Sequence, residues 1–208
     1  FSIDGIVSRG EAIIFSVSEK YNLGPEYNFI IDGFAAGFND KENRINISNI
    51  AEIAVEAVKS VGIENSTFSA DVLLTDNGLF VLEIGIPLDA KIDRLLDFCG
   101  IKIYETICKL ACGLDINYQE LVMTQGYALK FLFANCTGIL SNYPDSKLDS
   151  LDHKTNRYTV EWQVKNGQSV APPRSIADTI GWVITKAKTS TEAYEWANKI
   201  ARECLVIV

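Results

Sequence analysis

Residues 68–85 read FSADVLLTDNGLFVLEIG, and no other stretch of the chain carries as much structural information. Apolar residues flank Asp76-Asn77-Gly78, a strong signal for a short turn between two antiparallel strands. Each flank also carries one acid, Asp71 before the turn and Glu83 after it. Because such a turn brings its strands side by side, we expect both carboxylates on one face of a hairpin.

The chemistry of these two acids leaves two interpretations open. Glu83 lies inside the apolar run of residues 80–84, so we expect it to be buried, which is costly for an acid without a partner. Two adjacent carboxylates repel each other unless a hard cation lies between them, and Mg²⁺ accepts carboxylate oxygens together with phosphate oxygens. The alternative is an edge hairpin with two solvated acids, and the spacing alone does not decide between them.

Further strand and helix patterns cover most of the chain. Apolar residues three and four apart between positions 47 and 61 predict an amphipathic helix, capped by Asn46 or Ser48 and ended by Gly62. Thr189 and Glu192 form a capping-box pattern that opens a last helix, with an apolar stripe at 193, 196, 197, 200 and 204. The other predicted elements are a hairpin at 1–18 turned by Arg9-Gly10, strands near 27–31, 127–134, 139–143, 158–164, 182–185 and 205–208, and helices at 91–98 and 103–112.

The stretch 68–85 resembles the metal-binding hairpin of ATP-grasp enzymes, in which an acid precedes the turn and the second strand ends in Glu-Ile-Asn or Glu-Ile-Gly. The resemblance implies that Asp71 and Glu83 bind Mg²⁺, or Mn²⁺ in its place, and through it the phosphates of ATP. FSIDGIVSRGEAIIFSVSEK, residues 1–20, resembles the preceding hairpin of the family. Lys20 then matches a family cation that contacts the ATP phosphates; the alternative is a solvated loop lysine.

The carboxyl-terminal half resembles the closing region of the carbamoyl-phosphate synthase and biotin carboxylase branch. The matching segments are YALKFLFANCTGIL at 127–140, GWVI at 181–184 and KTSTEAYEWANKIA at 188–201. The resemblance implies an α+β fold with a mostly antiparallel sheet. We expect the ATP-grasp carboxyl-terminal lobe over residues 1–115 and a small β-rich subdomain over residues 116–208.

Two positions depart from the family motif Glu-Ile-Asn-Pro-Arg. Gly85 stands where a third metal ligand would be, and Pro87 stands where an Arg steadies the transferred phosphate. Lys91 and Arg94, at the start of the next predicted helix, are the candidates to replace that Arg as catalytic cations. If neither does, the chemistry of this branch is changed or lost.

The resemblance implies an ATP-dependent ligase that joins a small carboxylate to an amine or thiol through an acyl-phosphate. A non-catalytic nucleotide-binding or interaction module on the same fold is the alternative, and a plain structural α+β domain is a third. Nothing before Phe1 resembles the first ATP-grasp lobe, so we expect the chain to be a piece of a longer protein and inactive alone. Homodimer formation stays open.

Charge and composition limit the possible binding partners and indicate the cellular compartment. The net charge is −8 without clusters of Lys and Arg, which argues against a nucleic-acid partner. No apolar run approaches the roughly 18 residues that a membrane span needs. The five cysteines, an odd number, predict buried free thiols and a reducing, cytoplasmic compartment. His153 lies in a polar stretch and is expected to be an ordinary surface histidine.

Overall fold

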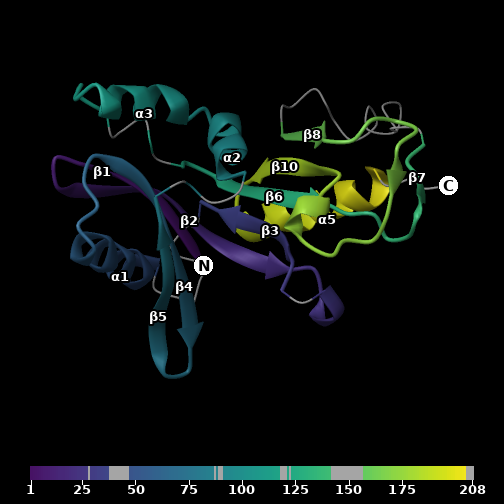
Figure 1. Cartoon of the computed structure of the whole chain (residues 1–208), viewed down its shortest axis with the longest axis horizontal. Helices are drawn as coiled ribbons and strands as arrows, with labels where there is room; N and C mark the ends of the chain where they lie inside the picture. Colours follow the sequence, from purple (N-terminus) through teal and green to yellow (C-terminus); the bar gives the residue numbers. More distant parts are fainter. Residues whose placement is uncertain are drawn as a thin grey trace. The chain divides into compact units, whose positions relative to one another are not determined.

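The computed structural model of the chain is drawn in Figure 1, and it describes residues 1–27, 29–37, 47–86, 88, 91–117, 121, 123–141 and 157–204. The chain divides into two compact units. Unit 1 contains residues 1–19 and 36–125, and unit 2 contains residues 20–35 and 126–208. The predicted domain division after residue 115 stays a prediction.

Unit 1 is built on two antiparallel hairpins. Strands β1 (Ser2–Ser8), β2 (Glu11–Asn22), β4 (Ser66–Thr75) and β5 (Gly78–Gly85) hydrogen-bond in the order β5-β4-β1-β2, and each neighbouring pair is antiparallel. Both predicted hairpins are therefore confirmed. Arg9 and Gly10 turn the first hairpin with φ of 52° and 80°, and Gly78 closes the second turn with φ of 117°. Positive φ at a turn favours glycine because it has no Cβ to clash with the backbone.

Helix α1 (Ile47–Ser60) covers one face of these strands. It buries Ile50, Ala54 and Val58 in one cluster with apolar residues of β1 and β4, which confirms the predicted amphipathic helix. Gly62 has φ of 72° directly after the helix, as expected of a residue that ends one. Two details of the prediction are wrong: Ser48 lies inside the helix and not at its cap, and Val61 is exposed. Asn46 lies outside the described residues.

Two shorter helices follow β5 in unit 1. They are α2 (Ile92–Phe98) and α3 (Ile103–Ala111), close to the predicted ranges. Helix α3 buries Ile103, Thr106 and Leu110, so the helical period turns Cys108 outward. The prediction of buried thiols holds for Cys204 alone: Cys99 is half-buried, and Cys108, Cys112 and Cys136 are exposed.

Unit 2 continues from the end of β2. Strands β3 (Ile31–Ala36), β6 (Gly126–Leu132), β10 (Gly181–Ala187) and β8 (Tyr158–Trp162) follow it in the order β2-β3-β6-β10-β8. The pairs β6–β10 and β10–β8 are antiparallel. Strands β7 (Gly138–Ile139) and β9 (Ser169–Val170) form a separate short ladder, and β9 was not predicted. The fold is thus α+β with mostly antiparallel strands, as predicted.

Helix α5 (Ser190–Cys204) packs on β6 and β10. Its buried residues Ala193, Ala197 and Ile200 belong to the core of unit 2. The Thr189 hydroxyl accepts a hydrogen bond from the Glu192 backbone N–H at 3.1 Å, as the capping-box pattern predicted. This bond satisfies one of the donors that every helix leaves open at its start.

The predicted strand near residues 27–31 is wrong at its beginning. Residues Pro25–Tyr27 form a 3₁₀ turn (η1), and the strand begins only at Ile31. The Tyr27 backbone N–H donates to the Gly24 carbonyl at 3.1 Å, so it is used within the turn and not in a strand ladder. A second 3₁₀ turn, η5 (Ile176–Asp178), precedes β10. The predicted strand at 205–208 and His153 lie outside the described residues.

Among the described residues, no helix has both the length and the apolar character that crossing a membrane requires.

Candidate metal and nucleotide site

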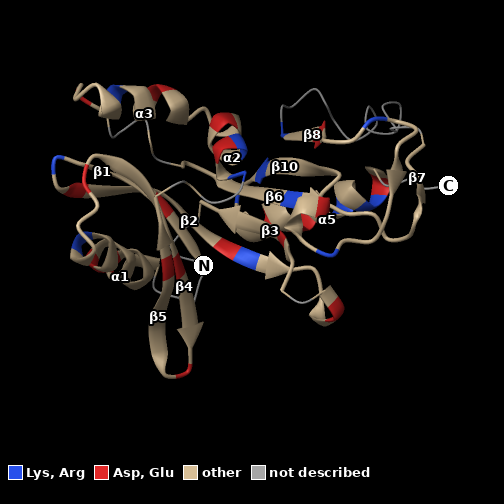
Figure 2. Cartoon of the chain, in the orientation of Figure 1, with Lys and Arg blue, Asp and Glu red and all other residues tan. Residues whose placement is uncertain are grey.

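Asp71 and Glu83 face each other across β4 and β5. They are direct partners in the antiparallel register, so their side chains leave the sheet on the same face. The strands carry one acid each, and Figure 2 shows acidic positions in red on β4 and β5. The register shifts after this pair, because Val72 is opposite Val81 and Leu82 is an extra residue on β5. A β-bulge of this kind re-aims the neighbouring side chains. The structure thus brings the two predicted carboxylates together.

The expected burial of Glu83 is wrong. Asp71 is half-buried, whereas Glu83 is exposed, as are Leu82 at 64% and Phe80 at 50%. The reason is the alternation of side chains along β5: Ile84 packs against the apolar cluster that α1 covers, so its neighbour Glu83 lies on the opposite face of the strand. The cost of burying an unpaired acid therefore supplies no argument for a metal. The argument for a metal site rests on the pairing of the two acids.

A row of polar residues continues from this pair across unit 1. Ser2 of β1 is opposite Asp71, and Ser18 of β2 is opposite Ser2, so four strands in succession place a polar side chain on the same face. Ser2 and Ser18 are only 2% and 1% exposed. Small buried hydroxyls leave room and supply hydrogen bonds, whereas an apolar face would carry Val or Leu at these positions.

A second polar row lies beside the first. Asp4 of β1 is opposite Ser16 on one side and Ser69 on the other. The Ser2 hydroxyl donates to Asp4 Oδ2 at 3.3 Å and lies 3.2 Å from the Ser69 hydroxyl, which joins the two rows. Asp4 is fully buried. A buried carboxylate is retained only where hydrogen bonds compensate its lost hydration, so this face is organised around polar contacts.

The sequence prediction missed these rows, although a signal for them exists. Ser2 and Asp4 alternate with apolar residues in the first strand, and Ser16 and Ser18 do so in the second. Alternation of this kind assigns the polar residues to one face of each strand. Which polar faces meet depends on the pairing of β1 with β4, whose partners are about 60 to 70 positions apart in the chain.

The three predicted cations lie on different elements. Lys20 is half-buried on the last part of β2, which belongs to unit 2. Lys91 caps the start of α2 with a left-handed backbone, φ 65° and ψ 6°. Arg94 is exposed in the first turn of α2, with its Nε 3.9 Å from Asp93 Oδ2. Asp93 also accepts a hydrogen bond from Tyr104 at 2.6 Å, which raises the pKa of that phenol. The structure gives Arg94 an acidic neighbour of its own.

The carboxylate pair fits a divalent cation that also binds phosphate. Among the described residues no cluster of three or more His, Cys, Asp or Glu side chains could hold a metal ion by protein ligands alone. Mg²⁺ binds to proteins through one or two carboxylates, with phosphate and water oxygens completing its shell. Asp71 and Glu83 match that requirement. Gly85, opposite Ser69, supplies no third side-chain oxygen from β5.

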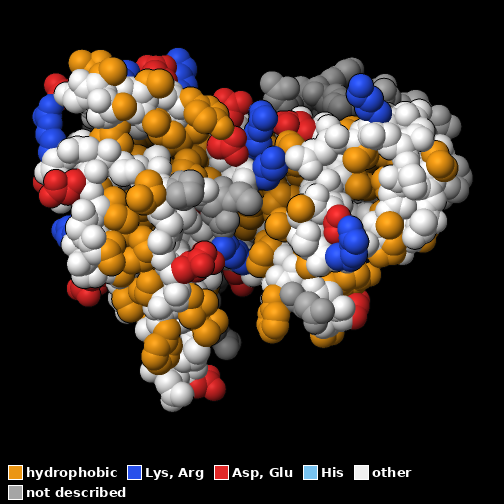
Figure 3. Space-filling view, viewed as in Figure 1, with side chains coloured by type: hydrophobic (Ala, Val, Ile, Leu, Met, Phe, Trp, Pro, Cys, Tyr) orange, Lys and Arg blue, Asp and Glu red, His pale blue; other side chains and the backbone are white. Residues whose placement is uncertain are grey.

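The hairpin that carries the pair also exposes apolar side chains. Leu73, Leu74, Phe80 and Leu82 are between 42% and 64% exposed, and Figure 3 shows hydrophobic side chains on the surface of the β4–β5 hairpin. The polar pair thus lies beside an apolar surface on the same element.

Solved structures that this chain resembles include ATP-grasp ligases. The L-amino acid ligase from Bacillus licheniformis matches with a TM-score of 0.77 at 14% identity, over 100% of this chain and 53% of that chain. The chain has the ATP-grasp fold. Phosphoribosylglycinamide synthetase from Anaerococcus prevotii matches with a TM-score of 0.74 at 15% identity, over 100% and 52% of the two chains.

A third ATP-grasp neighbour was solved with bound nucleotide. It is the biotin carboxylase domain dimer of the Hydrogenobacter thermophilus 2-oxoglutarate carboxylase, in complex with MgADP, ADP and bicarbonate. Its TM-score is 0.68 at 14% identity, over 100% of this chain and 45% of that chain. This chain therefore spans about half the length of the ATP-grasp proteins it resembles. The sequence matches no family model and no curated protein.

Proposed function

We propose that this chain is the metal-binding part of an ATP-dependent ligase that joins a small carboxylate to an amine or thiol. The observation that carries the proposal is the direct pairing of Asp71 with Glu83 on adjacent strands of an ATP-grasp fold. Neighbours with this fold are ATP-dependent ligases. Two paired carboxylates on a largely solvated hairpin would bind the cation of a metal–nucleotide complex that lies over them.

In this proposal Asp71 and Glu83 hold Mg²⁺, or Mn²⁺ in its place, against the phosphates of ATP. The metal would neutralise charge on the phosphoryl group that is transferred. Ser2, opposite Asp71 on the neighbouring strand, would lie beside the metal ligand, and its hydrogen bond to Asp4 holds the Ser2 hydroxyl in position. Lys20 would contact the phosphates, and Lys91 or Arg94 would supply the positive charge that the family motif carries where this chain has Pro87.

The proposed reaction has two steps. A substrate carboxylate oxygen attacks the γ-phosphorus of ATP, the bond to ADP breaks, and an acyl-phosphate forms. The amine nitrogen or thiol sulfur then attacks the acyl carbon, inorganic phosphate leaves, and the nucleophile gives up its proton. The residues of this chain act by positioning and by charge, because phosphoryl transfer needs little covalent help from the protein. We propose the cytoplasm as the compartment and retain homodimer formation as a prediction.

The second candidate is a nucleotide-binding or interaction module without catalysis. Gly85 favours it, because β5 offers no third oxygen ligand after Glu83. The ion pair of Arg94 with Asp93 also favours it, because a cation with an acidic neighbour is less available to a phosphate. ADP formation in the whole protein separates the two candidates.

The experiment measures ADP formation by the whole protein at saturating Mg²⁺, across a panel of carboxylic acids with an amine or thiol present. Glu83→Gln should lower turnover on the order of a thousandfold, since it removes one charged metal ligand and keeps the shape. Lys91→Ala and Arg94→Ala identify which cation acts in catalysis. Glu64→Gln, at another exposed glutamate, is the matched control and should leave turnover unchanged. Near-normal turnover in Glu83→Gln would show that the metal lies elsewhere.

A further inference from the structure

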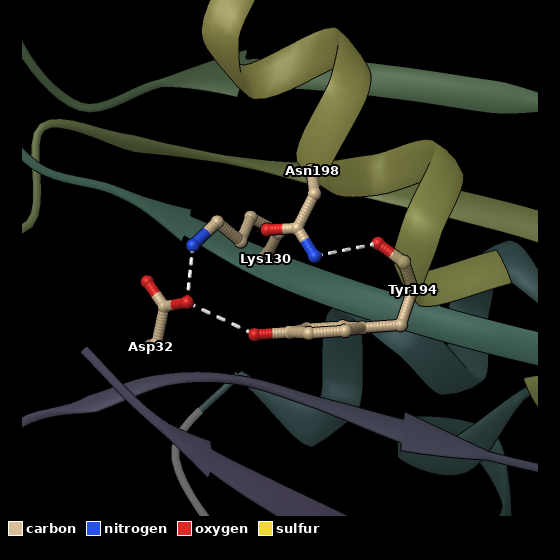
Figure 4. Close-up of polar contacts among 4 residues, drawn as sticks. All are labelled: Asp32, Lys130, Tyr194 and Asn198. Atoms are coloured by element: carbon tan, nitrogen blue, oxygen red, sulfur yellow. Dashed lines mark hydrogen bonds and ion pairs between the residues drawn. The ribbon is translucent and has the colours of Figure 1, made fainter. Parts of the chain in front are cut away.

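The buried ion pair of unit 2 is a structural contact. The Lys130 ammonium contacts Asp32 Oδ2, and the Tyr194 hydroxyl donates to the same oxygen at 2.9 Å (Figure 4). A cavity of about 250 Å³ lies beside this pair, with walls from β3, β6 and α5. Asp32 is only 8% exposed, and its Oδ1 is buried. The two donors offset the hydration that the carboxylate loses on burial, so the cluster serves the packing of these three elements.

Two exposed thiols of unit 1 form a different kind of cluster. Cys108 lies in α3 and Cys112 directly follows the last residue of that helix, and both are exposed free cysteines. Free cysteine is usually buried, where it packs as a small apolar residue. On a solvated surface the same side chain is open to metal ions and oxidants. Packing therefore does not explain why this helix presents two thiols to solvent.

The helix sets the spacing of these thiols. The Cys112 backbone N–H donates to the Cys108 carbonyl at 3.0 Å, so the two residues are one helical turn apart. Residues four apart lie on the same helix face, with about 5–6 Å between their Cβ atoms. Glu105 and Lys109, which neighbour them on the helix surface, pair with each other at 2.7 Å. The two thiols thus lie side by side next to a charge-neutral ion pair.

This spacing fits a bridging metal ion better than a disulfide. A disulfide needs its Cβ atoms about 3.5–4.5 Å apart, which is closer than a regular helix brings them. A thiolate sulfur lies about 2.3 Å from a first-row metal such as zinc, so two thiolates on opposite sides of one ion have sulfurs about 4.6 Å apart. One turn of an undistorted helix spans that separation, whereas a disulfide would require the helix to deform.

The number of ligands decides which ion fits. Among the residues that the structure describes, no group of three or more His, Cys, Asp or Glu side chains could hold a metal ion. Structural zinc takes four protein ligands, so two thiolates do not meet its requirement. Cu(I) is a soft ion that prefers thiolate sulfur, and it is stable with two ligands in a line. The thiol pair therefore matches Cu(I).

We propose that Cys108 and Cys112 form a two-coordinate site for one Cu(I) ion. Each thiol releases its proton to solvent as its sulfur binds the ion, so one Cu(I) displaces two protons and no electron is transferred. The site lies on the exposed face of α3 and uses none of the residues proposed to bind Mg-ATP. Copper binding here is independent of the proposed ligase activity.

The test is an anaerobic titration of the reduced chain with Cu(I), in competition with the coloured Cu(I) chelator bathocuproine disulfonate. We expect the chain to take one equivalent of Cu(I) from the chelator, and X-ray absorption of the complex to show two sulfur neighbours around copper. Failure to compete with the chelator, or copper bound to a single sulfur, would overturn the proposal. Rapid formation of a disulfide between the two residues in the folded chain under mild oxidation would contradict the spacing argument.

Three variants locate the ion. Cys108→Ser and Cys112→Ser should each weaken Cu(I) binding on the order of a hundredfold or more, because the remaining thiolate loses the gain of a linked second ligand. Both positions are exposed, so serine keeps the fold, which circular dichroism establishes. Cys136→Ser removes an exposed thiol of unit 2 and is the matched control, with unchanged affinity expected. Unchanged affinity in either α3 variant, or an equal loss in Cys136→Ser, would contradict the assignment.

Discussion

Asp71 and Glu83 oppose each other on neighbouring strands, and like charges in this position destabilise a sheet. Without a metal, we therefore expect Glu83→Gln to keep the free energy of unfolding within about 0.5 kcal/mol of the parent chain, or to raise it. Mg²⁺ should raise the thermal midpoint of the parent chain and not that of Glu83→Gln, because only the parent pair binds the ion. Asp76→Asn, at an exposed acid in the turn, is the control. A clear loss of stability in metal-free Glu83→Gln would assign Glu83 a structural role instead.

Cys204 differs from the other thiols in its burial. Desolvation raises the pKa of its thiol from 9.0 to about 12, so it stays protonated in the folded chain at mildly alkaline pH. We expect a maleimide to label the exposed Cys108, Cys112 and Cys136 quickly and Cys204 only after unfolding. Since the unfolded thiol ionises at its ordinary pKa, the stability that Cys204 contributes falls as the pH rises from 9 toward 12. Mass spectrometry of the labelled peptides checks the predicted order of labelling, and rapid labelling of Cys204 in the native chain would contradict it.

At the residue scale, the sequence predicts local pairings well and distant ones poorly. Asp71 and Glu83 could be placed together because the turn between them is short and its chemistry is distinctive. Ser2 and Asp4 could not be joined to that pair, since the register of β1 against β4 depends on packing across more than 60 residues. The exposure of Glu83 was missed for a related reason: apolar neighbours in sequence do not establish that anything covers a strand.

Among the elements, α5 offers the most direct test of how sequence sets a boundary. Thr189→Ala removes the hydroxyl that accepts from the Glu192 backbone N–H, which should cost about 1 kcal/mol in the free energy of unfolding. Thr189→Ser keeps the hydroxyl and should lower the free energy of unfolding much less. Chemical denaturation of the three chains measures the difference. Equal stability of the Ala and Ser variants would show that the cap contributes nothing to α5.

The prediction of helices and strands succeeded where residues close in sequence determine the structure. The hairpins at 1–18 and 67–84 follow from their turn residues, and α1 follows from its apolar spacing. Prediction failed at β3, where apolar residues precede the strand but Pro25–Tyr27 forms a 3₁₀ turn. It also missed β9, since a two-residue strand has no periodicity to detect.

At the scale of the whole molecule, the contacts that define unit 2 join distant segments. Asp32 meets Lys130 and Tyr194 across 98 and 162 positions of sequence. Neither the ion pair nor the cavity beside it leaves a local pattern that a reader of the sequence could use. The α+β class and the ATP-grasp resemblance were predictable, because both rest on the order of several short motifs along the chain.

The chain spans about half the length of its ATP-grasp neighbours, and this bears on what it does alone. We expect it to bind Mg-ATP weakly and to form no ADP, because in our proposal the rest of the protein supplies most nucleotide contacts. Titration calorimetry and a coupled ADP assay on the chain by itself measure both. Tight binding, or ADP formation at an enzyme-like rate, would show that these residues suffice.

The central claim is that Asp71 and Glu83 hold the metal of a metal–ATP complex. Paramagnetic broadening of backbone amide signals by Mn²⁺ with ATP tests it directly, because the effect is local and detects weak binding. The account predicts broadening centred on the β4–β5 residues around Asp71 and Glu83, abolished in Glu83→Gln and preserved in Glu64→Gln. Broadening centred on any other element, or the same broadening in Glu83→Gln, would contradict it.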